Sequence, residues 1–318
     1  MSIIVSDCTL NNIKQAAMGL KYGALVAFPT ETVYGLGADA ENEAAINRMY
    51  QVKNRPKDHP VIVHIADLDD VEFWAEDLPD YAIELMREFW PGPMTLLLHR
   101  SANVGNFLTG NQEVIGIRIP NHALALTLLS EFKKVGGHGI AAPSANRYGA
   151  VSPTIASAVE MELKPYLHSD DLILDGGPCL VGVESTIIDC TTNNPRILRP
   201  GAITKEMIEA STGISVQTPE GEFARVSGSN EKHYAPKAKV EIATTANPND
   251  GFIALKEIAT PVGAVRLAQP VSLEDYARQL YSALRKGDDL GLNKIVIVPP
   301  DGDGLAIAIR DRINRAAS

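Results

Sequence analysis

Short apolar runs alternate with amphipathic stretches through residues 1–205, and this alternation constrains the fold more than any other feature. The apolar runs predict strands at residues 24–28, 61–65, 94–98, 114–119, 139–142, 171–174 and 185–189. The amphipathic stretches predict helices at residues 11–21, 41–52, 79–89, 121–133 and 153–163. Several residues mark helix starts: Asn11 or Asn12, Glu41 or Asn42, and Ser152 followed by Pro153. The pattern predicts an α/β or α+β domain built on a large sheet.

A second, smaller module follows a polar segment. Residues 211–232 contain glycine and show poor periodicity, which is typical of a linker. Beyond them the pattern predicts strands at 238–243, 261–266 and 294–298 and helices at 272–286 and 304–315. A chain of 318 residues also exceeds the usual size of a single core. We therefore expect a large domain at residues 1–210, a linker at 211–237 and a small α/β domain at 238–318.

Composition narrows the functional classes. The formal net charge of −10 argues against a broad nucleic-acid-binding surface, which is usually basic. The three cysteines, Cys8, Cys179 and Cys190, have no CxxC spacing, which argues against a disulfide framework and a cysteine-based zinc site. The N-terminus lacks the pattern of a signal peptide, and no apolar run approaches the ~18–20 residues of a membrane span. We expect a cytoplasmic protein with no membrane contact.

Residues 29–37, PTETVYGLG, carry chemistry that a hydrophobic core does not need. The hydroxyls of Thr30, Thr32 and Tyr34 can donate and accept hydrogen bonds. Gly35 and Gly37 allow a sharp turn or a close approach of the backbone to a ligand. The segment is either a strand-to-helix turn that uses threonine for capping or part of a small-molecule site. Segments of the same character elsewhere in the chain favour the second interpretation.

Three cations lie in such segments. Lys53 and Arg55 are two residues apart, and Pro56 disfavours helix at Arg55, so an extended exit from the helix would put both on one side. Such a pair can bind a polyphosphate or can be an ordinary solvated surface pair. Arg118 lies between Ile117 and Ile119 in a strand that otherwise appears buried. An unpaired charge there is costly, so Arg118 either faces solvent on an edge or pairs with an anion.

Other polar residues keep two interpretations open. His64, in the apolar run VIVHI, can be a core histidine satisfied by a backbone carbonyl or a ligand contact. Ser144 and Asn146, in the sequence PSAN, can form a turn or contact a ligand. Ser185 lies outside a G-x-S-x-G elbow, which weakens the hypothesis of a hydrolase nucleophile. The sequence has no P-loop motif and no HExxH motif.

Taken together, the segments resemble the YrdC-type threonylcarbamoyl-AMP synthases in their longer, two-domain form. The resemblance rests on several separate blocks in the family's order: PTETVYGLG, KNRP, IGIRIP, AAPSANR, GVESTIID, LRPG and HYAP. It covers nearly the whole chain. It implies a twisted mixed-sheet catalytic domain with a concave cleft, followed by a small Rossmann-like α/β C-terminal domain.

The resemblance implies synthesis of L-threonylcarbamoyl-AMP from L-threonine, bicarbonate and ATP, with release of pyrophosphate, for modification of adenosine 37 in tRNAs that read ANN codons. It implies a catalytic pair, Lys53 and Arg55, and an L-threonine site of Thr32, His64, Arg118, Ala142 and Ser185. It implies a nucleotide site of Arg55, His59, Val114, Ser144, Asn146, Ser152, Arg199 and Tyr234. Mg²⁺ is the expected cofactor and comes with ATP, because no side chain is assigned to a metal.

One segment departs from the family pattern. Longer members usually carry a Pro-Gly-Met run, a basic residue and an aromatic residue before His-Tyr-Ala-Pro, whereas residues 227–232 here are SGSNEK. The family uses the segment around Tyr234 to close over the nucleotide, so closure as a lid is an open question for this chain. The expected partners are the proteins that transfer the threonylcarbamoyl group to tRNA, together with weak binding of tRNA itself.

Three other functions compete with the synthase. The acidic net charge disfavours an RNA-binding module. The absence of Cys-rich zinc motifs and of an acylphosphatase-like module disfavours a carbamoyl-transfer enzyme of the hydrogenase-maturation type. The intact pairs Lys53 with Arg55 and Ser144 with Asn146 disfavour a regulatory paralogue without activity.

Overall fold

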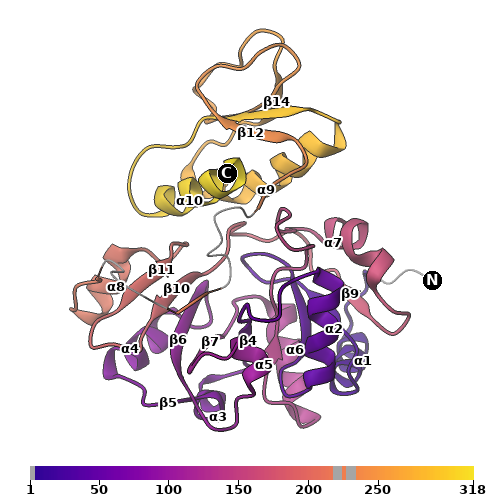
Figure 1. Cartoon of the computed structure of the whole chain (residues 1–318), viewed down its shortest axis with the longest axis vertical. Coiled ribbons are helices and arrows are strands. Elements are labelled where there is room, and N and C mark those ends of the chain that lie inside the picture. The colour runs from indigo at the N-terminus through magenta and orange to yellow at the C-terminus, as the bar shows by residue number, and fades with distance from the viewer. Residues whose placement is uncertain (1–3, 218–223, 227–233) are drawn as a thin grey trace.

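The chain forms a large domain and a small domain, seen below and above in Figure 1. The computed structural model describes residues 4–217, 224–226 and 234–318. The large domain contains the strands β1 (Ile4–Val5), β2 (Val26–Phe28), β3 (Gly35–Asp39), β4 (Ile62–His64), β5 (Ala75–Glu76), β6 (Met94–Arg100), β7 (Val114–Arg118), β8 (Ile140–Ala141), β9 (Leu172–Leu174), β10 (Thr186–Asp189) and β11 (Arg196–Arg199). Its helices are α1 (Leu10–Lys21), α2 (Glu43–Lys53), α3 (Val71–Trp74), α4 (Asp80–Phe89), α5 (Asn106–Thr109), α6 (Ala123–Lys134), α7 (Ala156–Leu163) and α8 (Lys205–Thr212).

The strands join into one mixed sheet in the order β1-β9-β2-β3-β8-β4-β7-β6-β10-β11, with β5 paired to β6. The parallel and antiparallel pairings bring several strand ends to the same edge. β4 and β7 are parallel, and His64 pairs with Arg118 at their carboxyl ends. β6 is antiparallel to β7, and β10 is parallel to β6, so β10 begins where β7 ends. The polar segments that precede and follow these strands therefore meet at one edge.

Helices cover both faces of this sheet, and strand β2 shows why. Alternate side chains on a strand point to opposite faces. Leu25 and Ala27 pack in the core that contains α2 and α4, whereas Val26 and Phe28 pack in the core between α1 and α6. All four side chains are buried. The continuous apolar run at 24–28 is thus the pattern of a strand between two helical layers.

The small domain is a parallel sheet in the order β12-β15-β13-β14. Its elements are β12 (Lys239–Ile242), β13 (Gly251–Ile253), β14 (Val265–Ala268), α9 (Leu273–Asp289), β15 (Lys294–Ile297) and α10 (Leu305–Ala317). α9 and α10 lie between this sheet and the large domain in Figure 1. The predicted class, a mixed-sheet domain followed by a small α/β domain, is confirmed.

Some local predictions are wrong. The helix expected at 153–163 begins at Ala156, because Ser152 directs its hydroxyl to Glu184 and caps no helix. Residues 35–39 form strand β3, in which Gly35 and Gly37 permit close strand packing and make no turn. The first helix is capped by Thr9, whereas Asn42 caps the second as predicted. The strand expected at 261–266 lies at Val265–Ala268, and β13 was not predicted.

Candidate functional site

A cavity lies at the sheet edge where β4, β7, β8 and β11 end and β3 and β10 begin. It is lined by Thr30, Thr32, Val33, Gly35, Lys53, Arg55, Ile62, His64, Arg118, Ala142, Pro143, Ser144, Asn146, Tyr148, Glu184, Ser185, Arg199 and Tyr234. The structure thereby brings together most of the residues singled out in the sequence. Three of the predicted residues, His59, Val114 and Ser152, do not line it.

Two of those three residues, His59 and Ser152, contact residues that line the cavity. The ring of His59 packs edge-on against Tyr148, with 5.5 Å between ring centroids. Ser152 donates a hydrogen bond of 2.6 Å to Oε1 of Glu184. Val114 begins β7 and packs with Leu97 and Ile187. His59 and Ser152 therefore reach the cavity through a neighbour.

Arg118 pairs with an anion, as one of the two sequence interpretations requires. Its Nη2 lies 2.7 Å from Oε1 of Glu31, and both side chains are buried. Its Nη1 donates to Oγ1 of Thr32 at 2.9 Å, and its Nε donates to the carbonyl of Gly92. β7 lies between β4 and β6, so an edge position is excluded. The segment 29–37 thus supplies the partners of a cation that comes from another strand.

Lys53 and Arg55 are buried, which excludes a solvated surface pair. Lys53 is the last residue of α2, and Asn54 ends the helix in the left-handed conformation at φ 52°. The ammonium group of Lys53 donates to the carbonyls of Ser144, at 2.5 Å, and Asn146, at 2.6 Å. Arg55 donates to the carbonyl of Pro60 at 2.9 Å. Lys53 therefore holds the PSAN turn, which connects two segments far apart in the sequence.

Electrostatics at the cavity follow from burial. Desolvation, together with the charge of Arg55, holds the pKa of Lys53 well below its usual value. Desolvation and the positive charge of Arg118 lower the pKa of His64 to about 3, so its imidazole is neutral at physiological pH. Nδ1 of His64, Nε of Arg55 and Oδ1 of Asn146 are buried and have no hydrogen-bond partner among the residues that the structure describes. Such atoms are suited to a polar ligand.

Ser185 and Arg199 form a second part of the wall. Arg199 donates through Nε and Nη2 to the carbonyl of Ser185 and through Nη2 to its hydroxyl, at 3.0, 2.9 and 3.0 Å. Ser185 Oγ also lies 2.8 Å from Oγ1 of Thr95 in β6. These residues are buried. The hydroxyl of Ser185 is therefore held from two sides.

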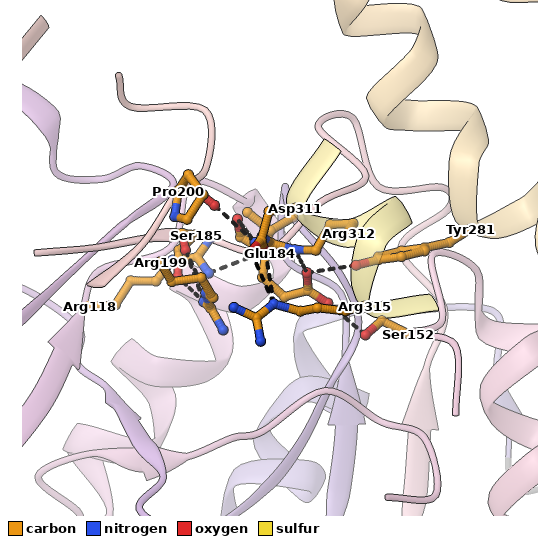
Figure 2. A network of polar contacts seen from close by, with 11 residues as sticks. Arg118, Ser152, Glu184, Ser185, Arg199, Pro200, Tyr281, Asp311, Arg312 and Arg315 are labelled. Atoms are coloured by element: carbon orange, nitrogen blue, oxygen red, sulfur yellow. Dashed lines mark hydrogen bonds and ion pairs between the residues drawn. The ribbon is translucent and has the colours of Figure 1, made fainter. Parts of the chain in front are cut away.

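Glu184 connects the cavity to the small domain (Figure 2). Its Oε2 accepts hydrogen bonds from Tyr281 of α9 and Arg312 of α10, each at 2.8 Å. Arg312 also donates to the carbonyl of Pro200 at 3.0 Å, and its guanidinium lies 5.4 Å from the ring centroid of Tyr234. Burial by itself raises the pKa of Glu184, but the charges of Arg312 and Arg199 lower it to about 2. A carboxylate of the first domain is thus kept ionised by the second domain.

The sequence interpretation missed Glu184, Tyr281, Arg312 and Thr95. A signal for Arg312 exists, because positions 309, 313 and 316 are apolar at helical spacing and Arg312 falls on the same buried stripe. A charge in that position requires a partner. Nothing in the sequence indicates that the partner is Glu184. His233 and residues 227–232 lie outside the described residues.

Fold and site together define a two-domain α/β protein with a buried, cation-lined cavity suited to anionic small molecules. Comparisons with known proteins then identify the family. Residues 19–201 match the family of Sua5, YciO and YrdC, described as telomere recombination, and residues 203–318 match the threonylcarbamoyl-AMP synthase C-terminal domain. The chain belongs to the threonylcarbamoyl-AMP synthase family and is an enzyme of that class.

Individual relatives agree with this assignment. The chain is 37% identical to the threonylcarbamoyl-AMP synthase of Pyrococcus abyssi, over 96% of this chain and 94% of the relative. It is 38% identical to that of Bacillus subtilis, over 96% and 92%. A crystal structure of P. abyssi Sua5 complexed with L-threonine has a TM-score of 0.86 at 35% identity, over 97% of this chain and 95% of that one.

A P. abyssi Sua5 variant with two alanine substitutions has a TM-score of 0.89 at 33% identity, over 100% of this chain and 96% of that one. The resemblance stated from the sequence motifs is therefore confirmed. In the part of the chain that the structure describes, no helix is long and apolar enough to cross a membrane.

Proposed function

We propose that this protein makes L-threonylcarbamoyl-AMP from L-threonine, bicarbonate and ATP and releases pyrophosphate. One observation carries the proposal: the buried cations Lys53, Arg55 and Arg199 surround one cavity, beside the ion pair of Arg118 with Glu31, in a chain whose net charge is −10. Buried cations in an acidic protein are costly unless anions bind among them. The triphosphate of ATP, the carboxylate of L-threonine and bicarbonate are anionic groups of the required kind.

The chemistry needs positioning and charge stabilisation more than a covalent nucleophile. The neutral amine of threonine takes up bicarbonate with loss of water and becomes a carbamate. A carbamate oxygen then attacks the α-phosphorus of ATP, and the bond to the pyrophosphate oxygen breaks. Charge develops on the phosphoryl oxygens, where Lys53 and Arg55 would stabilise it. Because both cations are already buried and held, little reorganisation accompanies the reaction.

We assign the amino acid to the side of the cavity that contains Thr32, His64, Arg118, Ala142 and Ser185. Arg118 is a fork-shaped donor suited to a carboxylate. Neutral His64 can accept or donate a hydrogen bond without repelling the ammonium form of the substrate. The L-threonine complex of the P. abyssi relative supports this ligand class. We assign the nucleotide to the side of Ser144, Asn146, Arg199 and Tyr234, and we keep His59, Val114 and Ser152 in the same assignment.

Mg²⁺ would enter with the triphosphate. Among the described residues, no group of three or more His, Cys, Asp or Glu side chains could hold a metal ion. Glu184, the carboxylate that lines the cavity, is already occupied by Ser152, Tyr281 and Arg312. Because Mg²⁺ usually keeps several waters and binds substrate phosphates, it does not require a cage of protein ligands. Added Mg²⁺ would neutralise phosphate charge beside Lys53 and Arg55.

The decisive experiment measures pyrophosphate release from ATP with Mg²⁺, with L-threonine and bicarbonate each present or omitted. We expect release only when both are present. Arg55→Ala should reduce the rate about 100-fold or more, because it removes a charge stabiliser. Arg87→Ala, which changes an exposed arginine of α4, is the matched control and should keep the wild-type rate.

Release that needs neither co-substrate would indicate a simple ATP pyrophosphohydrolase. No release from folded protein that binds both ATP and L-threonine would contradict the synthase and favour a regulatory role.

We further propose that proteins transferring the threonylcarbamoyl group to adenosine 37 of ANN-reading tRNAs consume the product. Formation of modified tRNA in a coupled assay that depends on this protein would test that step, and filter binding at several salt concentrations would test weak tRNA binding.

A further inference from the structure

Thr95 is a buried polar residue for which the proposed reaction has no role so far. It is the second residue of β6 and has no exposed surface. Its Oγ1 is 2.8 Å from Oγ of Ser185, and this is its only hydrogen-bond contact among the described residues. Ser185 lines the cavity, but Thr95 does not. Thr95 can thus act on a ligand only through Ser185.

The direction of this hydrogen bond follows from counting protons. Each hydroxyl has one proton to donate and two lone pairs to accept with. If Ser185 donated to Thr95, the proton of Thr95 would be buried without an acceptor, which is costly. Thr95 therefore donates to Ser185. Arg199, which can only donate, also gives a hydrogen bond to Ser185 Oγ at 3.0 Å. Both lone pairs of Ser185 are then used, and its proton is left to point into the cavity.

Thr32, on the amino-acid side of the cavity, has no such fixed polarity. Oγ1 of Thr30 already accepts from the backbone N–H groups of Thr32 and Val33, at 3.1 and 3.2 Å. The proton of Thr30 can go to the carbonyl of Val33, at 2.7 Å, or to Oγ1 of Thr32, at 2.8 Å. Arg118 donates to Thr32 at 2.9 Å. At Ser185, by contrast, the contacts fix the direction of the hydroxyl proton.

We propose that Thr95 is a positioning residue for the amino-acid substrate: it turns the Ser185 proton into the cavity, where that proton binds the substrate carboxylate. The inference rests on the proposed function, and it adds a reason why the site would select ligands that carry a carboxylate. A zwitterionic amino acid has a carboxylate that needs hydrogen-bond donors. Ser185 supplies one, and its polarity is set by Thr95, which lies behind it.

The test compares Thr95→Val with Thr95→Ser. Valine has nearly the shape of threonine and suits a strand, but it lacks the hydroxyl. Affinity for L-threonine, measured by calorimetry on the full chain, should fall about 3- to 10-fold in Thr95→Val, the worth of one net hydrogen bond. Thr95→Ser should restore it. Thr109→Val is the control, because Thr109 is equally buried and its hydroxyl has no hydrogen-bond partner among the described residues. KM for ATP should not change.

A ligand comparison separates this role from general damage. L-threoninol has a neutral hydroxymethyl group in place of the carboxylate and accepts a weaker hydrogen bond from Ser185. Thr95→Val should therefore weaken the binding of L-threoninol, measured by competition with L-threonine, less than it weakens the binding of L-threonine. Ser185→Ala should also add little to the loss in Thr95→Val. An equal loss for both ligands, or unchanged L-threonine affinity in Thr95→Val, would overturn the inference. If wild-type protein does not bind L-threonine at all, the proposed function fails instead.

Discussion

Oε2 of Glu184 lies 2.8 Å from Nε of Arg312, and this ion pair joins the cavity wall to the last helix of the chain. Arg312 has no exposed surface, and Glu184 is 7% exposed. Tyr281 of the second domain donates to the same oxygen. A complete cavity therefore requires both domains to be packed together.

Removing Arg312 should destabilise the protein strongly. Arg312→Met leaves Glu184 buried without its main counter-ion, which costs about 3–5 kcal/mol in comparable cases. Urea unfolding should show this loss. The double variant Glu184→Gln/Arg312→Met should lose less than Arg312→Met alone, because no buried carboxylate is then left without its main counter-ion. Arg278→Ala, in an exposed ion pair of α9, should change the free energy of unfolding by less than about 1 kcal/mol. Equal losses in Arg312→Met and Arg278→Ala would contradict the argument.

Glu184 should also make stability depend on acid pH. Its pKa is lowered from 4.5 to about 2 in the folded protein. The unfolded chain therefore takes up a proton first as pH falls, and the stabilisation present above pH 4.5 is lost progressively down to about pH 2. The free energy of unfolding of wild type should fall by up to about 3 kcal/mol more than that of Glu184→Gln over this range. Parallel curves for the two proteins would show that Glu184 is not held ionised.

His64 should not titrate in the physiological range. Burial and the charge of Arg118 lower its pKa to about 3. In a titration of ring signals followed by NMR, the resonance lost in His64→Gln should not move between pH 8 and 5. Since the unfolded chain does bind a proton near pH 6.5, His64 also makes the folded state less stable as pH falls from 6.5 toward 3. A ring signal with a midpoint near 6.5 that disappears in His64→Gln would contradict the burial argument.

Lys53 should be irreplaceable by arginine. Its ammonium group donates hydrogen bonds to the carbonyls of Ser144 and Asn146, and Lys53 itself is only 1% exposed. A guanidinium is larger and planar, so Lys53→Arg should displace the turn even though it preserves the charge. We expect at least a 10-fold loss of pyrophosphate release in Lys53→Arg, and a larger loss in Lys53→Met. Full activity in Lys53→Arg would mean that Lys53 supplies charge alone. Lys57→Arg, at an exposed position shortly after it, is the control.

Two glycines should respond in opposite ways to alanine. A Cβ at Gly37 would lie 2.8 Å from a methyl group of Ile140 and 2.9 Å from the carbonyl of Val26, so Gly37→Ala should cost about 1–3 kcal/mol through overpacking. Gly19 lies within α1, where the nearest atom to a Cβ is 3.5 Å away. Gly19→Ala should stabilise the protein by about 0.5–1 kcal/mol. Thermal unfolding of both variants tests the pair, and a stabilised Gly37→Ala would refute the packing argument.

Much of the fold was predictable because its signals are local. The run at 24–28 indicates a strand buried on both faces, and the stripes of α1 and α9 indicate amphipathic helices. Short or irregular elements were not predictable. β3 is rich in glycine, which is depleted in strands, and it forms because β2 and β8 pair with it on either side. α7 begins late because Ser152 makes a tertiary hydrogen bond and does not cap the helix.

By itself, the sequence determined the layered class of the fold, the order of its motifs and the need of Arg118 for a partner, since periodicity and the cost of a buried charge are properties of neighbouring residues. Only the tertiary structure decided which carboxylates pair with the buried arginines. Arg118 pairs with Glu31, and Arg312 pairs with Glu184, through contacts that cross strands and domains. The direction of the Thr95–Ser185 hydrogen bond depends on what else each hydroxyl touches. Such contacts depend on distances of a few ångströms between segments that are remote in the chain. Strand order and domain packing set these distances.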